Sequence, residues 1–307
     1  MAKTAYITHP DCRLHDMGGY HPECPQRLQA IDDYLVSQGM DTLLTSYGAP
    51  LVALEALCRV HAKDYVEKVR EAAPTAGIVH LDADTAMNPQ SWKAALRAAG
   101  AAVLAVDLVM RGEADNAFCA IRPPGHHALR DAAMGFCIFN NVAVAAAHAL
   151  EEHHLKRVAI IDFDVHHGNG TEEMFSGDAR VLMCSIFQHP FFPFSGTHGA
   201  AANMLNVPLE RGAGSKEFRA VVEQQWIPRL ESFEPQLILV SAGFDAHRED
   251  DIGGLELVDE DYAWCTEQIK KLAQRYAQAR IVSMLEGGYN LDALARSVAA
   301  HLKELAA

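Results

Sequence analysis

Short apolar runs rich in β-branched residues alternate with longer stretches of helical periodicity along almost the whole chain. This alternation predicts strand–helix–strand units, which build a parallel sheet because each helix returns the chain across one face of the sheet. Several runs are apolar at every position, which is typical of central strands that are covered on both sides. The sequence therefore predicts an α/β fold with an open, mostly parallel sheet and helices on both faces.

The expected elements follow each other without a visible boundary. We expect strands at residues 5–8, 117–121, 157–163, 180–186, 236–241 and 280–285. We expect helices at residues 26–37, 62–73, 91–111, 141–154, 216–232, 260–277 and 291–304. No linker rich in Pro, Gly or Ser and no internal repeat divides the chain, so we expect one domain over residues 1–307.

Composition excludes several classes of protein. Forty acidic against 26 basic side chains give a formal net charge of −14, which disfavours direct nucleic-acid binding because that needs Lys and Arg. Seven cysteines without a C-x-x-C pair indicate neither a disulfide framework nor a thiolate zinc site. The start of the chain lacks the apolar segment of a secretion signal, and Arg97 and Asp107 interrupt the best membrane-spanning candidate. We therefore expect a cytoplasmic protein without membrane contact.

Polar clusters follow four of the expected strands, at the point where each strand ends. They read R-P-P-G-H-H at 122–127, D-V-H-H-G-N-G at 164–170, A-G-F-D at 242–245 and E-G-G-Y at 286–289. In open parallel sheets, ligands bind at the carboxyl ends of the strands. The sequence therefore predicts that these clusters meet in one site on that edge of the sheet.

The second and third clusters carry residues that bind metals. Asp162, Asp164 and His166 are spaced at i, i+2 and i+4, which places them on one face of an extended segment. With Asp245, Asp164 and His166 form a set of two carboxylates and one imidazole, which suits one catalytic Zn²⁺ with open positions, or alternatively Fe²⁺. A solvated turn after a buried strand is the alternative interpretation of this motif.

The first and last clusters supply groups for proton transfer. His126 and His127 lie on a turn that Pro and Gly rigidify. Asp162 is the expected partner of one imidazole and Asn169 of the other, and a carboxylate raises a histidine pKa more than an amide does. One histidine should then be cationic and the other a neutral base, unless the pair only caps the turn. Tyr289 follows two glycines, so its phenol could donate to a developing oxyanion, although packing alone would also explain it.

Aromatic residues gather after the histidine pair and after another strand. They are Phe136, Phe187, Phe191, Phe192 and Phe194, two of which could wall a tunnel for an alkyl chain, with rim packing as the alternative. We interpret His148, His153, His154, His189 and His198 as surface or structural residues.

The four motifs, in this order and together with H-P-E-C-P-Q-R-L at 21–28, resemble those of the histone deacetylase family, which has the arginase–deacetylase fold. The resemblance spans nearly the whole chain. Asn169 stands where one branch of the family has Asp, so the chain is most similar to class II enzymes and to bacterial histone deacetylase-like amidohydrolases.

The resemblance implies a role for each matching residue. It implies zinc on Asp164, His166 and Asp245, with Asp162 supporting His126 and Asn169 supporting His127. His127 would be the general base and then acid, His126 its electrostatic partner and Tyr289 the oxyanion donor. Phe136, Phe192, Gly135 and Gly288 would contact the substrate. It also implies structural potassium near Asp162, through its carboxylate and through carbonyls that include those of Asp164, His166 and Ser185, and a second ion near Phe175, Asp178 and Val181.

The implied reaction is hydrolysis of an acetyl-lysine-like amide by metal-activated water, without a covalent intermediate. Alternatives are an acetylpolyamine or another small acylated amine as substrate, and a non-catalytic protein that binds acylated ligands. An arginase-like reaction is disfavoured because Gly168 replaces a ligand of its second metal. Polyamine-selective relatives have an acidic residue at the position that we count as Ile252. Phe194 stands where the family often has Gly. Asp82 and Asp84 could hold the backbone of a peptide substrate. A homo-oligomer is compatible with the sequence.

Overall fold

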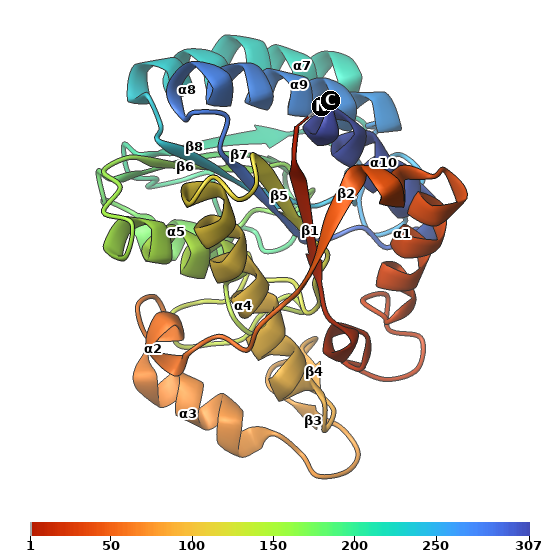
Figure 1. Cartoon of the computed structure of the whole chain (residues 1–307). Coiled ribbons are helices and arrows are strands. Elements are labelled where there is room, and N and C mark those ends of the chain that lie inside the picture. The colour runs from red at the N-terminus through yellow and green to blue at the C-terminus, as the bar shows by residue number, and fades with distance from the viewer. Residues whose placement is uncertain (1) are drawn as a thin grey trace.

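The computed structural model describes residues 2–307. It confirms the predicted α/β architecture, an open parallel sheet between layers of helices (Figure 1). Eight strands pair in the order β2-β1-β5-β10-β9-β6-β7-β8, and every pair is parallel. Their bounds are β1 Thr4–Thr8, β2 Leu44–Gly48, β5 Asn116–Cys119, β6 Val158–Asp162, β7 Val181–Gln188, β8 Met204–Leu209, β9 Leu237–Ala242 and β10 Ile281–Leu285. A separate antiparallel pair consists of β3 Val79–His80 and β4 Ala86–Met87.

Helices cover the sheet on both sides. They are α1 Gln26–Ser37, α2 Leu54–Leu57, α3 Lys63–Ala72, α4 Ser91–Met110, α5 Asn141–Glu151, α6 Asn169–Phe175, α7 Ser215–Val221, α8 Ile227–Phe233, α9 Asp259–Tyr276 and α10 Leu291–Ala306. In Figure 1, α7, α8 and α9 lie on one side of the sheet, and α4 and α5 lie on the other. The apolar side chains of both layers and of the sheet form one buried hydrophobic cluster. None of the helices among residues 2–307 has the length and apolar character needed to span a bilayer.

The predicted elements are present, with two kinds of difference. The edge strands β2 and β8 were not predicted, because partly exposed edge strands lack the continuous apolar run of the buried central strands. The helix expected at 216–232 is divided into α7, the π-helical turn η3 Val222–Trp226, and α8. Pro228 lies just after this turn and has no backbone N–H to continue the α-helical pattern.

The strand order brings the four polar clusters together. β5, β10, β9 and β6 are consecutive neighbours in the sheet, and these are the four strands that precede the clusters. Their carboxyl ends are aligned, since Leu285 pairs with Ala242 and Asp162 pairs with Ser241. The loops that leave these strands therefore converge at one edge of the sheet, as the sequence predicted.

Candidate active site and metal centre

Three side chains from two strand ends form a buried cluster with metal-ligand geometry. Asp164 and His166 follow β6, and Asp245 follows β9. His166 Nδ1 lies 3.0 Å from Asp164 Oδ1 and 3.2 Å from Asp245 Oδ2. One donor atom from each residue lies within 4.8 Å of the other two, and all three side chains are buried. The expected ligands are thus within reach of a single ion.

The hydrogen bonds of the carboxylates leave one oxygen aimed into the cluster. Asp164 Oδ2 accepts the Gly287 N–H at 2.9 Å, and Asp245 Oδ1 accepts the Val165 N–H at 2.9 Å. Asp245 Oδ2 is buried and, although it lies 3.2 Å from His166 Nδ1, it makes no hydrogen bond with the described residues. A buried, unpaired carboxylate oxygen is costly unless a cation binds it. The residues present therefore fit a metal ion.

Two glycines allow the backbone to approach these carboxylates. A Cβ atom on Gly243 would lie 2.0 Å from Asp164 Oδ2, and one on Gly287 would lie 2.0 Å from Asp245 Oδ2. Both distances are far below van der Waals contact, so any side chain would displace a carboxylate of the cluster. The glycines of A-G-F-D and E-G-G-Y are thus required by the position of the Asp164 and Asp245 carboxylates.

The ionisation of the cluster reflects two carboxylates in a buried space. Burial and the negative charge of Asp164 raise the pKa of Asp245 to about 6. Burial would lower the pKa of His166, but the adjacent carboxylates of Asp164 and Asp245 outweigh it and raise that pKa to about 9. The two carboxylates repel each other and attract positive charge. Two hard oxygen ligands and one imidazole match Zn²⁺ or Fe²⁺.

The two adjacent histidines have different partners. His126 Nδ1 lies 3.0 Å from Asp162 Oδ2, and His127 Nδ1 lies 2.7 Å from Asn169 Oδ1. An amide oxygen only accepts, so His127 Nδ1 carries the proton and its Nε2 has the free lone pair. The structure thus places Asp162 and Asn169 beside the histidines for which they were expected.

These partners separate the two histidines electrostatically. Burial would lower the pKa of His126, but the charges of Asp164 and Asp162 outweigh it and raise that pKa well above its usual value. Burial lowers the pKa of His127 well below its usual value, and the positive charges of His126 and His166 lower it further. The surroundings therefore favour the protonated form of His126 and the neutral form of His127.

Glu286 fixes the turn that carries the histidines, a role that the sequence analysis did not assign. Its Oε2 accepts the N–H groups of Gly125 at 2.6 Å and His126 at 3.1 Å, and its Oε1 accepts the Ser241 hydroxyl at 3.1 Å. Burial raises the pKa of Glu286 to about 7. The first residue of the E-G-G-Y motif therefore positions the R-P-P-G-H-H turn.

A buried arginine holds the segment that carries Tyr289. Arg27 donates from Nε to the Gly288 carbonyl at 2.6 Å and from Nη2 to the Glu286 carbonyl at 2.5 Å. Its guanidinium lies 4.9 Å from the centre of the Tyr289 ring. Glu23 bridges Arg27 at 3.3 Å and Arg122 Nη2 at 2.7 Å. The early H-P-E-C-P-Q-R-L segment thus positions the catalytic edge, which no local pattern in that segment indicated.

A narrow cavity of about 220 Å³ leads to this cluster. Its lining residues are Asp84, His127, Gly135, Phe136, His166, Phe191, Phe192, Ile252 and Tyr289. The Phe136 and Tyr289 rings meet edge to face with centroids 5.8 Å apart, and the Phe192 ring meets His127 in the same way at 5.2 Å. Gly135 has a φ of +56°, and a Cβ there would lie 2.5 Å from the His127 ring. The rings of Phe136 and Phe192 therefore line the passage to His127.

Other expected contact residues lie elsewhere. Phe187 packs on His167 with ring centroids 4.7 Å apart, Phe194 is 73% exposed, and Gly288 faces Arg27 instead of the cavity lining. Asp82 Oδ1 accepts the N–H groups of Asp84 and Thr85 at 3.0 and 2.6 Å, which ties their loop. Ile252 does line the cavity, at the position counted from Asp245.

The two expected potassium regions differ. Asp162 pairs in register with Ser185 on the neighbouring strand, and its Oδ1 accepts the Asp164 N–H at 3.1 Å. The carbonyls of Phe175, Asp178 and Val181 do converge, but they surround Asn203 Nδ2 at 2.8, 3.0 and 2.9 Å. An amide donor therefore satisfies the carbonyls of the second region. A cation there would have to displace the Asn203 side chain.

Comparisons with known proteins agree with this geometry. The histone deacetylase domain family matches residues 21–305. Type-2 histone deacetylase 2 of Dictyostelium discoideum is 38% identical over 99% of this chain, which spans only 21% of that protein. The histone deacetylase-like amidohydrolase of Pseudomonas aeruginosa is 39% identical over 88% of this chain and 73% of its own length. The crystal structure of the HDA15 HD domain superimposes with a TM-score of 0.93 at 33% identity, covering 99% of this chain and 88% of that one. The chain belongs to the histone deacetylase family.

Proposed function

We propose that the protein is a zinc-dependent deacetylase that removes the acetyl group from an acetyl-lysine-like amine. The observation that carries the proposal is the position of His127, whose Nε2 has a free lone pair and whose ring lines the same narrow cavity as His166 and Tyr289. A base, a metal ligand and a phenol thus border the space in which an amide carbonyl would lie.

Each group has a role in the hydrolysis. Zinc on Asp164, His166 and Asp245 would supply Lewis-acid chemistry, which activates water and polarises the carbonyl. His127 Nε2 accepts a proton from the attacking water and later delivers it to the departing amine. The cationic His126 stabilises the negative charge that develops beside it. Acetate and a free primary amine result, and no step requires a covalent bond to the protein.

Tyr289 is the proposed donor to the oxyanion. Burial and the negative charges of Asp245 and Asp164 raise its pKa well above the usual value against the opposing charge of Arg27. Its hydroxyl therefore stays protonated and can donate to the carbonyl oxygen as negative charge develops there. The contact of its ring with Phe136 and the bond from Arg27 to the Gly288 carbonyl fix its position.

The cavity supports a lysine-type substrate. The Phe136 and Phe192 rings on its lining suit an unbranched alkyl chain. Ile252 gives the lining an apolar side chain where a carboxylate would attract the second amine of a polyamine. Asp84 is half-buried on the same lining and accepts the Gly135 N–H at 3.1 Å, which engages one of its oxygens. Acetylpolyamine is the second substrate to test.

The experiment measures acetate release from acetyl-lysine peptides and acetylpolyamines by zinc-loaded protein. We expect kcat/KM to favour the peptide, and Tyr289→Phe to lower kcat by roughly 10²-fold or more because one oxyanion donor is lost. Tyr47→Phe, on the edge strand β2, is the matched control and should have no effect. Binding of the acetylated peptide without turnover would instead indicate a non-catalytic binding protein.

We also infer that the protein acts in the cytoplasm and that a potassium ion lies beside Asp162. Five of the seven free cysteines are buried in the core, which suits a reducing compartment. Asp162 and Ser185 are cross-strand neighbours at the end of β6 and β7. Potassium-dependent thermal stability that Asp162→Asn abolishes would support the ion, and identical melting in sodium and potassium would contradict it.

A further inference from the structure

A second cluster of metal-ligand type lies outside the active site. Asp107 is in the last turn of α4, His148 is near the end of α5, and His153 follows α5. Asp107 Oδ1 lies 2.8 Å from His148 Nε2 and 2.8 Å from His153 Nε2. The three donor atoms all lie within 4.8 Å of one another. The side chains of Asp107, His148 and His153 are 22%, 11% and 19% exposed, so an ion from solvent can reach them.

The donor set matches borderline transition metals. Two imidazole nitrogens and one carboxylate oxygen suit Zn²⁺, Ni²⁺, Co²⁺ and Cu²⁺ better than Mg²⁺ or Ca²⁺. Ligands at 2.0–2.1 Å in a tetrahedral site lie about 3.3 Å apart, so each of the two Asp–His donor pairs needs to open by only about 0.5 Å. His153 lies beyond the helix end and can make this adjustment without changing α5.

The two oxygens of the Asp107 carboxylate have different partners. Oδ1 faces both imidazoles. Arg111 Nη2 donates to the other oxygen, Oδ2, at 3.2 Å. Oδ1 is therefore the coordinating oxygen, and Arg111 holds the carboxylate in place from the opposite side, as outer partners of metal ligands commonly do.

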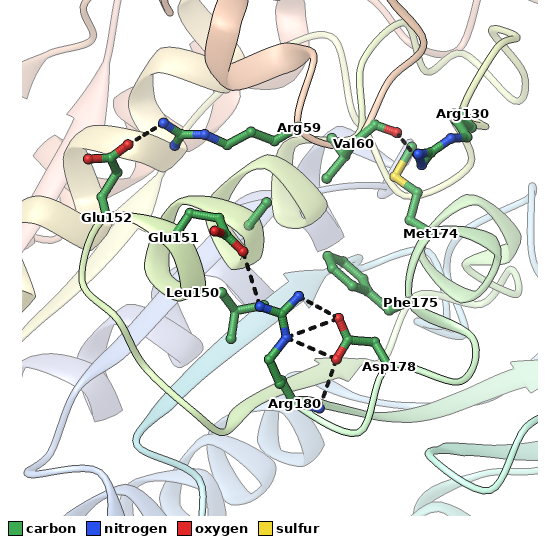
Figure 2. A pocket seen from close by; sticks show the side chains of 11 residues that line it. Arg59, Val60, Arg130, Leu150, Glu151, Glu152, Met174, Phe175, Asp178 and Arg180 are labelled. Carbon is green, nitrogen blue, oxygen red and sulfur yellow. Dashed lines mark hydrogen bonds and ion pairs between the residues drawn. The ribbon is translucent and has the colours of Figure 1, made fainter.

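Arg59 opposes metal binding at one ligand. Its Nη1 lies 3.3 Å from His148 Nδ1, where a guanidinium can only donate. This contact favours the tautomer with the proton on Nε2, whereas coordination requires a lone pair there. Arg59 also pairs with Glu152 on the rim of a neighbouring cavity (Figure 2). Glu152 can retain Arg59 when His148 changes its tautomer, so Arg59 should weaken the site without abolishing it.

We propose that Asp107, His148 and His153 form a second transition-metal site that joins the end of α4 to the end of α5. It is a structural site, because its three ligands come from the helical layer and none of them lines the active-site cavity. The proposal does not depend on the function of that cavity.

The test titrates Ni²⁺ into protein that already holds one Zn²⁺ per chain, with calorimetry and melting temperature as readouts. We expect one Ni²⁺ to bind per chain and to raise the melting temperature, since the ion binds the folded state. His153→Ala should weaken Ni²⁺ binding by roughly 100-fold or more, because losing a ligand costs at least as much as losing an outer partner. His154→Ala, the exposed neighbouring histidine, is the matched control and should bind Ni²⁺ normally.

A further variant tests the role of Arg59. Arg59→Gln should bind Ni²⁺ more tightly than the wild type, because the donor to His148 Nδ1 no longer competes. The proposal is overturned if the wild type binds no Ni²⁺ beyond the Zn²⁺ already present. It is equally overturned if His153→Ala, with an unchanged melting temperature in the absence of Ni²⁺, binds Ni²⁺ as tightly as the wild type.

Discussion

The chain presents an Asp–His cluster in two settings, one buried at strand ends and one at the surface between helices. The buried cluster has two carboxylates and one imidazole, and the surface cluster has one carboxylate and two imidazoles. Donor atoms lie 3.0 and 3.2 Å apart in the first and 2.8 Å apart in the second. The donor distances in the two clusters are therefore similar, but carboxylates outnumber imidazoles in the buried cluster and imidazoles outnumber carboxylates in the surface cluster.

The difference shows how surroundings decide what such a cluster does. In the buried cluster Asp245 Oδ2 makes no hydrogen bond, so a bound cation would offset both the desolvation of that oxygen and the repulsion between the Asp164 and Asp245 carboxylates. In the surface cluster both histidines can satisfy the carboxylate by hydrogen bonding, and Arg59 and Arg111 add positive charge. A metal should bind the buried cluster strongly, as part of catalysis, and the surface cluster weakly, as an added tie between helices.

Matched substitutions of the two aspartates should give the largest contrast. Asp245→Asn removes a ligand charge from the buried cluster and should lower kcat/KM by roughly 10³-fold, since the Lewis acid supplies several kcal/mol. Asp107→Asn should leave kcat/KM within about twofold, because that cluster lies outside the cavity. Steady-state deacetylation of an acetyl-lysine peptide measures both. Equal losses in the two variants would show that the clusters are not functionally distinct.

A buried histidine should also make the free energy of unfolding depend on pH, whereas an exposed histidine should not. His61 is buried, donates from Nδ1 to the Leu129 carbonyl at 3.0 Å and accepts the Asn140 N–H at 2.9 Å. Burial lowers its pKa from 6.5 to about 4. The unfolded chain therefore binds a proton at higher pH than the folded one does, and the folded state loses stability as pH falls below 6.5.

The expected loss from His61 is about 2 kcal/mol between pH 7.5 and pH 5. Urea unfolding at the two pH values measures it. His61→Gln should reduce the pH dependence by that amount, and His154→Gln at the surface should not change it. If His61→Gln retained the full pH dependence, the acid sensitivity would have to come from other groups.

A smaller effect should follow from exchanging the partner of the base. Asn169→Asp places a carboxylate beside His127 Nδ1, which raises the pKa of that histidine. The base is active when unprotonated, so kcat/KM falls as pH drops through its pKa. In the wild type the lowered pKa of His127 places this fall below 6.5, and the variant should move it upward by about one pH unit. A pH profile that does not move would argue against His127 as the base.

Much of the fold could be read from the sequence because buried parallel strands leave continuous apolar runs. Five of the six predicted strands are fully buried in the structure, whereas the edge strands β2 and β8 have exposed positions and left no comparable signal. The expected metal ligands and the histidine pair could be brought together in the prediction because they follow strands directly. Their positions could be inferred from the rule that strand ends in a parallel sheet meet at one edge.

The residues that were missed act across long distances in the sequence. Arg27 reaches the carbonyls of Glu286 and Gly288 from 259 and 261 positions away, and no local pattern shows that contact. His148 and His153 were interpreted as surface or structural residues, since their shared partner Asp107 lies on a different helix, 41 and 46 positions away. Asn203 likewise gave no sign that its amide would meet the carbonyls of Phe175, Asp178 and Val181.

The most direct test of the central claim is the stoichiometry of zinc in catalysis. His153→Ala protein, which lacks the proposed surface site, is stripped of metal and titrated with Zn²⁺ while acetate release from an acetyl-lysine peptide is measured. We predict no turnover without metal and full activity at one Zn²⁺ per chain, with Asp245→Asn roughly 10³-fold less active throughout. Turnover that persists in the metal-free protein, or that Asp245→Asn retains, would contradict the assignment of deacetylation to the buried cluster.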